Sequence, residues 1–312
     1  MDQEQKIYDL IIIGAGPAGL TASIYASRYG LNHLVIGMLI GGKVAEAHKI
    51  SNFPTEQEIT GLELAEKIKK HAESLGTNLI QNQIVDLEKK DNYFVLKSDS
   101  LKEYYTKTIL IATGTKEKQL GLSNENKYLG KGLSYCFTCD GVFFKNKVVA
   151  IVGGGDAALS GALYLSEIAE KVYLIHRRNE FRAEKVWLEK LKANNKIIPI
   201  LNNEVVNLIG EEKLERIELL NTFNESKLLK VDGLFIEIGG VPTSVLLNKI
   251  QGEVDEEGYI KIDKKGRTNV LGVWAAGDVT NGSDKFSQIV TACAEGAIAS
   301  RDIYFYLKNQ KT

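Results

Sequence analysis

The sequence predicts an α/β protein of two domains, each a parallel sheet with helices on both faces, with one domain inserted into the other. Two observations predict the domains: a buried strand, a glycine-rich turn and a helix follow one another at residues 7–29, and the same order recurs at residues 147–168. A third observation predicts the insertion, because a strand and glycine turn at residues 272–279 return the chain to the first domain. The expected architecture is therefore two Rossmann-like three-layer domains, residues 1–114 with 241–312 and residues 115–240.

The composition is typical of a soluble globular protein: 312 residues, 44% hydrophobic and 25% charged, with a net charge of −1. This length allows two domains with sizeable cores. The balanced charge gives no reason to expect nucleic acid or an anionic membrane as a partner. The first residues are polar, and no apolar run approaches the length of a membrane span, so we expect a cytoplasmic protein.

The first glycine turn follows the apolar strand at residues 7–13 and reads Gly14-Ala15-Gly16-Pro17-Ala18-Gly19. Gly14 allows a tight turn, Gly16 lets the backbone approach a pyrophosphate, and Gly19 lets the following helix pack closely on the strand. The phosphates would lie at the N-terminus of this helix. A plain tight turn is the alternative, but the position directly after a buried strand near the N-terminus favours a dinucleotide site.

The second glycine turn, after the strand at residues 147–152, reads Gly153-Gly154-Gly155-Asp156-Ala157-Ala158. Two such turns imply two nucleotides. The next strand ends in His176-Arg177-Arg178, and Arg182 follows four residues later. Guanidinium groups stand here in place of the acid that prefers an unphosphorylated ribose, and they form strong bonds to a phosphate, so the cluster predicts NADP(H). A solvated basic face is the alternative.

The remaining segments complete the two domains. Residues 61–75 have the apolar spacing of an amphipathic helix. A small antiparallel meander is expected from strands at residues 78–85, 93–97 and 104–111, the last ending in the turn Thr113-Gly114. Strands at residues 197–201, 214–220 and 234–238 would finish the second domain. A long helix is expected at residues 289–307, with Ser287 as a candidate N-cap.

Two of the three cysteines, Cys136 and Cys139, form a C-x-x-C segment that is followed at once by Asp140. This spacing keeps both Cα atoms within disulfide reach, so the sulfurs can cycle between dithiol and disulfide with little backbone movement. Half of a zinc site has the same spacing, and so does a pair of inert buried thiols. In a reducing cytosol the pair favours catalysis or metal binding over a structural disulfide.

Taken in order, these segments resemble the low-molecular-weight thioredoxin reductases, which are flavoprotein pyridine nucleotide disulfide oxidoreductases. The resemblance covers nearly the full length and rests on an ordered set of motifs: Gly14 to Gly19, Gly41-Gly42, Asn52-Phe53-Pro54, Ala112-Thr113-Gly114, Cys136 to Asp140, Gly153 to Ala158, His176-Arg177-Arg178 with Arg182, and Ala276-Gly277-Asp278. It implies FAD on the domain formed by residues 1–114 and 241–312, and NADPH on the inserted domain, residues 115–240, which also holds the C-x-x-C segment.

The resemblance also implies individual cofactor contacts. Asp278 would bind the ribityl chain of FAD, and Gln288 would meet the flavin where the last helix begins. The other implied FAD contacts are Gly14, Gly16, Pro17, Ala18, Gly19, Gly41, Gly42, Lys43, Asn52, the backbone near Val85, Thr113, Gly114 and Gly277. Those implied for NADPH are Gly153, Gly155, Asp156, Ala157, Ala158, His176, Arg177, Arg178 and Arg182.

Three positions differ from the family pattern. Gly37-Met38 stands where an acid usually binds the FAD ribose, and Ser287 stands where arginine commonly precedes Gln288. Lys43 takes the place of a glutamine and brings a positive charge near the flavin pocket.

The mechanism that the resemblance implies is hydride transfer from NADPH to the flavin, followed by reduction of a Cys136–Cys139 disulfide. Cys139 would face the flavin, and Cys136 would attack the disulfide of thioredoxin. Asp140 would act as proton donor and acceptor, with helix capping as the alternative for this carboxylate. The family further implies a homodimer and a rotation between the two domains about a hinge near residues 114–118 and 238–242.

Other functions remain open at this point. A flavin disulfide reductase could take electrons from ferredoxin or deliver them to a glutaredoxin-like protein, although the intact arginine cluster argues for NADPH. A ferredoxin-NADP reductase is disfavoured because proteins of that group lack the C-x-x-C segment. A catalytically silent nucleotide-binding redox sensor is disfavoured because such a protein would not need two reactive thiols. A zinc site is disfavoured because Cys293 and four scattered histidines offer no second half-site.

Overall fold

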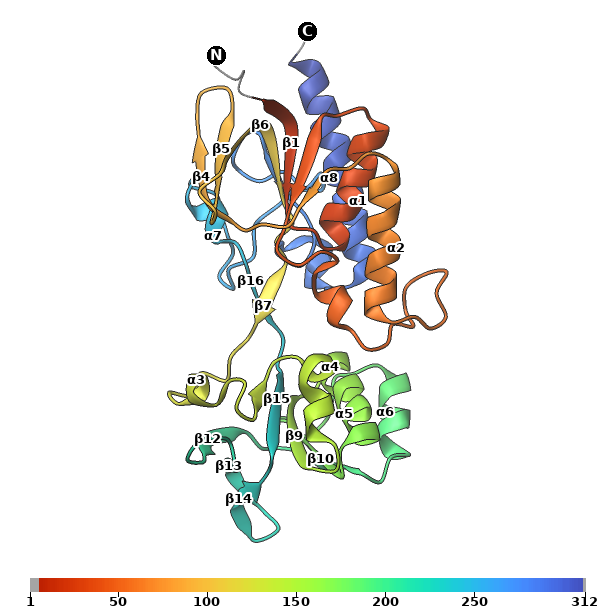
Figure 1. The fold of residues 1–312 in the computed structure, drawn as a ribbon, viewed down its shortest axis with the longest axis vertical. Coiled ribbons are helices and arrows are strands. Elements are labelled where there is room, and N and C mark those ends of the chain that lie inside the picture. Colours follow the sequence, from red (N-terminus) through yellow and green to blue (C-terminus); the bar gives the residue numbers. More distant parts are fainter. Residues whose placement is uncertain (1–5, 311–312) are drawn as a thin grey trace. The chain divides into compact units, whose positions relative to one another are not determined.

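The computed structural model describes residues 6–310 and confirms the predicted α/β fold class. The chain forms two compact units, one made of the residues up to Lys116 and from Val241 onward, the other of Glu117–Gly240. Each unit contains a mainly parallel sheet (Figure 1). No helix within residues 6–310 combines the length and the apolar character that a membrane crossing requires.

The first unit is built on a seven-stranded sheet. Its strands, from one edge, are β3 (Leu79–Ile80), β2 (His33–Ile36), β1 (Ile7–Ile13), β6 (Glu103–Ile111), β5 (Phe94–Ser98) and β4 (Ile84–Lys89), with β17 (Val273–Ala275) also paired to β6. Strands β1, β2, β3, β6 and β17 pair in parallel, whereas β4 and β5 form an antiparallel extension of β6.

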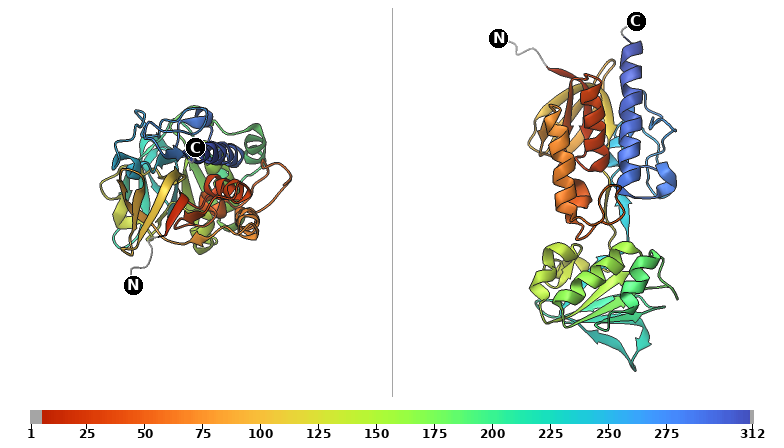
Figure 2. Two further views of the ribbon diagram at one scale, coloured as in Figure 1. Left: turned by 90° about the horizontal axis from the view of Figure 1, so that it is seen from above. Right: turned by 90° about the vertical axis from the view of Figure 1, so that its right-hand side faces the viewer.

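Both faces of this sheet are buried, which explains why β1 is apolar at successive positions. Leu10 and Ile12 pack toward the helices α1 (Pro17–Arg28) and α8 (Ile289–Asn309). Ile11 and Ile13 pack on the other face, against residues from β4, β5 and the segment that follows α7 (Val245–Asn248). Figures 1 and 2 show α1, α8 and α2 (Gly61–Ser74) together along one face of the sheet.

The second unit has a five-stranded parallel sheet. Its order is β11 (Ile197–Ile200), β10 (Lys171–Ile175), β9 (Val148–Gly153), β15 (Gly233–Glu237) and β8 (Leu133–Ser134). Helices α4 (Phe137–Asp140), α5 (Asp156–Ile168) and α6 (Lys185–Lys192) lie on one face, and the antiparallel strands β12 (Val205–Ile209), β13 (Arg216–Phe223) and β14 (Ser226–Lys230) cover the other (Figure 1). Helix α3 (Glu125–Tyr128) precedes β8.

The two chain crossings between the units pair with each other. Strand β7 (Thr115–Glu117) and strand β16 (Gly240–Pro242) form a two-stranded sheet, which we call the linking ribbon. Glycines with positive φ precede both strands, Gly114 at +63° and Gly239 at +99°. Such angles strain other residues, so glycine allows the sharp change of direction at each entry to the linking ribbon.

Two local predictions are wrong. Residues 78–85 do not form one strand: β3 pairs in parallel with β2 and β4 pairs with β5, so the two pieces lie at opposite edges of the sheet. Ser287 is not the cap of α8. Gln288 is the N-cap, because it has extended backbone angles and exchanges hydrogen bonds with Thr291 three residues later.

A buried histidine makes the stability of the first unit dependent on pH. His33 is 9% exposed at the start of β2, its Nδ1 donates to the Leu31 carbonyl (3.0 Å), and its Nε2 lies 3.4 Å from the Thr77 hydroxyl. Burial lowers the pKa of His33 from its ordinary 6.5, against a smaller opposing effect of the Leu31 hydrogen bond.

We therefore expect the free energy of unfolding to fall as the pH drops below 6.5. Below pH 6.5 the unfolded chain binds a proton at His33, whereas His33 in the folded chain stays neutral until the pH reaches its lower pKa. Between these two pKa values, acidification therefore stabilises the unfolded state relative to the folded state. Urea unfolding between pH 8 and pH 5 measures this loss. His33→Gln should reduce the pH dependence, whereas His71→Gln, at an exposed position on α2, should leave it in place. Equal pH dependence in all three proteins would contradict the assignment.

Candidate functional site

The first glycine turn lies at the carboxyl end of β1, where close backbone packing excludes side chains. Gly14 has φ +114°, and a Cβ there would lie 2.1 Å from the Ala112 carbonyl oxygen. A Cβ on Gly19 would lie 2.0 Å from the Gly14 carbonyl oxygen. Gly16 is the N-cap of α1, Pro17 begins the helix, and Gly16 has no side chain to occupy the helix N-terminus. The free N–H groups at this end suit a pyrophosphate.

A second loop closes on this turn. Gly41 donates its N–H to the Ala15 carbonyl (2.7 Å), and a Cβ on Gly42 would lie 2.9 Å from the Gly16 Cα. Both residues have positive φ, +92° and +60°. The two glycine loops thus form one backbone cradle that fits a dinucleotide diphosphate. Lys43 is exposed at the edge of this cradle, in the short helix Gly42–Glu46.

Other predicted FAD contacts lie around the same unit. Asn52 Nδ2 donates to Gln288 Oε1 (3.0 Å), so these two amides meet although they are far apart in sequence. Thr113 donates its hydroxyl to the Thr243 carbonyl (2.8 Å), and its own carbonyl accepts from the Thr243 hydroxyl (2.9 Å), so its backbone N–H is the group that can approach a cofactor. Val85 is 44% exposed where the register between β4 and β5 shifts. A backbone released from strand pairing at such a bulge can contact a ligand.

The predicted ribityl contact, Asp278, is partly buried after the turn at Gly277. Burial raises the pKa of the Asp278 carboxyl; the positive charge of Lys43 opposes this rise and Glu295 adds to it. Glu295 does not stand out in the sequence, yet it accepts from the Gly277 N–H (2.8 Å), the Thr280 hydroxyl (3.0 Å) and the Ser283 hydroxyl (2.6 Å). Its only sequence signal is a carboxylate within the apolar stretch after Gln288.

In the second unit, the second glycine turn lies at the carboxyl end of β9. A Cβ on Gly153 would lie 2.3 Å from the Glu237 carbonyl oxygen, and one on Gly154 would lie 2.2 Å from the His176 ring. Gly155 is the N-cap of α5. Asp156 begins the helix and accepts from the Glu184 N–H (2.8 Å), while Ala157 is exposed and Ala158 is buried. This turn therefore also leaves a helix N-terminus open to phosphate.

The arginine cluster lies at the end of the neighbouring strand β10. Arg177, Arg178 and Arg182 are exposed, and none has an ion pair or side-chain hydrogen bond within the described residues. The Arg182 N–H donates to the Gly154 carbonyl (2.7 Å), which joins the cluster to the glycine turn. This set of unpaired guanidinium groups beside a dinucleotide turn fits a ribose phosphate.

His176 is the buried base of this cluster, 6% exposed, and its ring packs against Phe181. Burial lowers the pKa of His176, and the charges of Arg182 and Arg178 lower it further. Its Nε2 has no hydrogen-bond partner among the described residues. A neutral ring filling the space beside Gly154 is consistent with its place at the cofactor turn.

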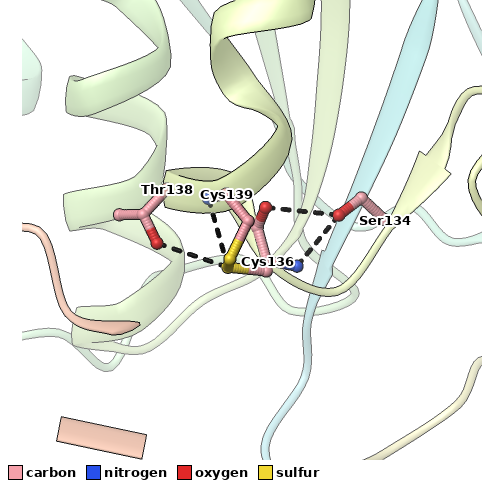
Figure 3. Close-up of a disulfide and its surroundings, with 4 residues drawn as sticks. All are labelled: Ser134, Cys136, Thr138 and Cys139. Carbon is pink, nitrogen blue, oxygen red and sulfur yellow. Dashed lines mark hydrogen bonds between the residues drawn. A yellow bond between two sulfur atoms is a disulfide. The ribbon is translucent and has the colours of Figure 1, made fainter. Parts of the chain in front are cut away.

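Cys136 and Cys139 form a disulfide with a Cα–Cα distance of 5.3 Å, which confirms the predicted pair (Figure 3). Cys136 is the N-cap of α4, and Cys139 lies in this helix. Cys139 is exposed, and Cys136 is partly buried. Phe137, between them, is buried and packs on Tyr164 of α5 (5.8 Å between ring centres), which fixes the segment to the sheet. The separate roles of the two sulfurs stay predictions.

Asp140 ends α4 and precedes the short helix Gly141–Phe144. Its side chain makes no capping hydrogen bond to that helix, so the alternative of a helix-capping carboxylate is not supported. Asp140 is partly buried, and it directly follows Cys139 in the sequence. Its role in proton transfer stays a prediction.

The redox segment and the nucleotide turn share one edge of the sheet in the second unit. Strands β8, β9 and β10 run parallel, and at their carboxyl ends stand Cys136, Gly153 and His176. Ligands of open α/β sheets bind outside this edge. Among residues 6–310 no three His, Cys, Asp or Glu side chains gather in the way that a metal ion would require.

The chain is similar to known proteins. Residues 8–296 match the family model described as pyridine nucleotide-disulphide oxidoreductase. The chain is 40% identical over 309 residues to the thioredoxin reductase of Bacillus subtilis (strain 168), covering 98% of this chain and 96% of that protein.

Solved structures are similar as well. The thioredoxin reductase of Lactococcus lactis in its FR conformation superposes with a TM-score of 0.91 at 32% identity, over 97% of this chain and 99% of that chain. A ferredoxin-flavin thioredoxin reductase from Clostridium acetobutylicum has a TM-score of 0.54 at 29% identity, over 98% and 100%.

Proposed function

Because the chain belongs to the pyridine nucleotide-disulphide oxidoreductase family, as a low-molecular-weight thioredoxin reductase, we propose that it uses NADPH to reduce the disulfide of thioredoxin or a thioredoxin-like protein. The main support is the Cys136–Cys139 disulfide at the same sheet edge as a nucleotide turn with three unpaired arginines. The family is one of flavin disulfide oxidoreductases that also bind a nicotinamide nucleotide. The choice of NADPH and of thioredoxin is our proposal.

The residues of the first unit would hold FAD. The cradle of Gly14, Gly16 and Gly42 would bind the diphosphate. Asp278 would bind the ribityl hydroxyls. Gln288 and Asn52 would contact the edge of the ring system. When bound, the flavin supplies the two-electron transfer between a nicotinamide and a disulfide. The N-terminus of α8 would favour negative charge on that ring.

The residues of the second unit would hold NADPH. The turn from Gly153 to Ala158 would bind the diphosphate, and Arg177, Arg178 and Arg182 would bind the 2′-phosphate with charge-assisted hydrogen bonds. Asp156 keeps the arginine loop in place through its bond to the Glu184 N–H. NADH lacks the phosphate, so the three guanidinium groups would favour NADPH.

The dithiol form would reduce the acceptor by thiol–disulfide exchange. The Cys136 thiolate attacks one acceptor sulfur, forms a mixed disulfide, and the second acceptor sulfur leaves with the electron pair of the broken bond. Asp140 would donate the proton that this sulfur takes up. Cys139 then gives its proton to the Asp140 carboxylate and attacks Cys136, which restores their disulfide, and the first acceptor sulfur leaves and takes up this second proton, so that the acceptor is released as a dithiol. Two electrons leave the cysteine pair and two protons end on the acceptor.

The setting of this reaction is also proposed. We infer a cytoplasmic homodimer, because the resemblance implies two chains and reduced thioredoxin is used in a reducing compartment. A rotation at the linking ribbon would let the cysteine pair alternate between the flavin and the acceptor, since the pair and the FAD cradle lie on different units.

Ferredoxin is the alternative electron donor. The similarity to a ferredoxin-flavin thioredoxin reductase keeps this donor open for a chain of the same architecture. The unpaired arginine cluster argues against it, because a ferredoxin-dependent enzyme would have no use for a phosphate site.

Anaerobic reduction of the FAD-loaded protein tests the proposal. Stoichiometric NADPH should bleach the flavin absorbance rapidly and NADH far more slowly, and oxidised thioredoxin should then restore the colour. If dithionite bleaches the flavin and neither nucleotide does, the NADPH assignment is wrong and reduced ferredoxin becomes the donor to test. If NADPH works and thioredoxin is not reduced, the acceptor assignment is wrong.

A further inference from the structure

The two sulfurs of the disulfide have unequal surroundings. Cys136 Sγ accepts from the backbone N–H of Cys139 (3.2 Å) and lies 3.3 Å from the Thr138 hydroxyl oxygen (Figure 3). A disulfide sulfur has no hydrogen, so the Thr138 hydroxyl is the donor. No hydrogen bond reaches the Cys139 sulfur within the part of the chain that the structure describes. Both donors therefore serve one sulfur.

The backbone of Cys136 is also held in place. Its N–H donates to Ser134 Oγ (3.0 Å), and the Ser134 hydroxyl donates to the Cys136 carbonyl (3.2 Å). Ser134 is 5% exposed at the end of β8, so it ties Cys136 to the sheet. The backbone of Cys136, from which its sulfur extends, is thereby held at the edge of the sheet.

We propose that Thr138 is a catalytic residue that stabilises the thiolate of Cys136 once the disulfide has been reduced, an inference that rests on the proposed function. Cleavage of the S–S bond in a C-x-x-C turn needs little backbone movement, so both donors stay beside Cys136 Sγ. Hydrogen bonds to the charged form of a thiol favour that form. Thr138 lies in the same short helix as Cys139, and this places its hydroxyl oxygen 3.3 Å from Cys136 Sγ.

The consequence is that the reduced pair has a defined charge distribution. Its negative charge resides on Cys136, the sulfur proposed to attack the acceptor disulfide. Cys139 keeps its proton until the mixed disulfide has formed, and it then gives that proton to Asp140 as it attacks Cys136. Thr138, together with the Cys139 N–H, thus selects which sulfur begins the exchange.

Alkylation of the reduced protein tests this assignment. The chain is reduced with dithiothreitol and desalted, iodoacetamide is added briefly at pH values from 5 to 10, and peptide mass spectrometry measures the modification of each cysteine. We expect Cys136 to react faster than Cys139 at neutral pH. Thr138→Val should slow Cys136 at pH 7 by about three- to tenfold, because one hydrogen bond to a partly exposed charge is lost. At high pH the two proteins should react equally fast.

Thr138→Ser is the matched control, because it keeps the hydroxyl, and it should react like the unaltered protein. The proposal is overturned if Thr138→Val leaves Cys136 unchanged, or if it slows both cysteines equally. If a variant does not fold, the relative alkylation rates of the two cysteines in the unaltered protein still test the proposal. Faster alkylation of Cys139 than of Cys136 would reject it. Since alkylation needs neither nucleotide nor thioredoxin, its outcome is separate from failure of the proposed enzyme activity.

Discussion

Cys139→Ser is expected to lower the rate of thioredoxin reduction by on the order of 10³-fold or more, because no second thiol remains to resolve the mixed disulfide. Cys136→Ser should lower it as much, since the attacking sulfur is gone. The two variants differ in what they trap. Cys139→Ser should form a mixed disulfide between Cys136 and thioredoxin, which mass spectrometry detects after an acid quench has stopped the freed thioredoxin thiol from reversing it, and Cys136→Ser should form none.

The control for this experiment is Cys293→Ser, on α8. This third thiol lies outside the redox segment, its Sγ is 3.9 Å from the Pro17 carbonyl oxygen, and burial raises its pKa. Its loss should leave thioredoxin reduction nearly unchanged. Flavin bleaching by NADPH should persist in all three variants, since the hydride step needs no cysteine. A mixed disulfide that forms through Cys139 would reverse the proposed roles of the two sulfurs.

Replacing both Arg177 and Arg178 with glutamine should raise the KM for NADPH by about 10- to 100-fold, with little change in kcat. A charge-assisted hydrogen bond to a phosphate contributes on the order of 1.5–3 kcal/mol, but both arginines are exposed and glutamine can still donate a neutral hydrogen bond. The expected net loss for the pair is therefore about 1.4–2.8 kcal/mol, which corresponds to the 10- to 100-fold change in KM. Both side chains are exposed and unpaired within the described residues, so their loss should not destabilise the fold.

Steady-state kinetics with NADPH and NADH separate phosphate recognition from a general defect. The KM for NADH should change little, because NADH has no 2′-phosphate. Arg216→Gln, at an exposed position on β13 of the same unit, is the matched control and should leave both values unchanged. An equal loss with both nucleotides, or no loss with NADPH, would show that the arginines do not bind the 2′-phosphate.

The features that the sequence predicts well are those with local signals. Each glycine turn is a short pattern whose spacing reflects a backbone approach, and the structure places a strand before and a helix after both. The disulfide follows from two cysteines three positions apart once the family is known. The arginine cluster follows directly on a strand, so its position at the sheet edge is also local.

The features that the sequence does not predict depend on contacts between distant segments. Glu295 meets Gly277 because α8 packs against the turn after β17, which no spacing along the chain encodes. The contact of His176 with Gly154 arises because β10 lies beside β9. The division of residues 78–85 between two sheet edges depends on strand pairing, which a local apolar pattern cannot specify.

The linking ribbon has a consequence for the engineering of this chain. Neighbouring strands lie about 5 Å apart, so β7 and β16 bring the start and the end of Glu117–Gly240 side by side. A segment whose ends meet can enter a loop of another protein without disturbing the host's sheet. The second unit, which holds the cysteine pair, thus has the geometry of a segment that can be inserted or removed as a whole, and a short turn from Lys116 to Val241 would close the first unit without it.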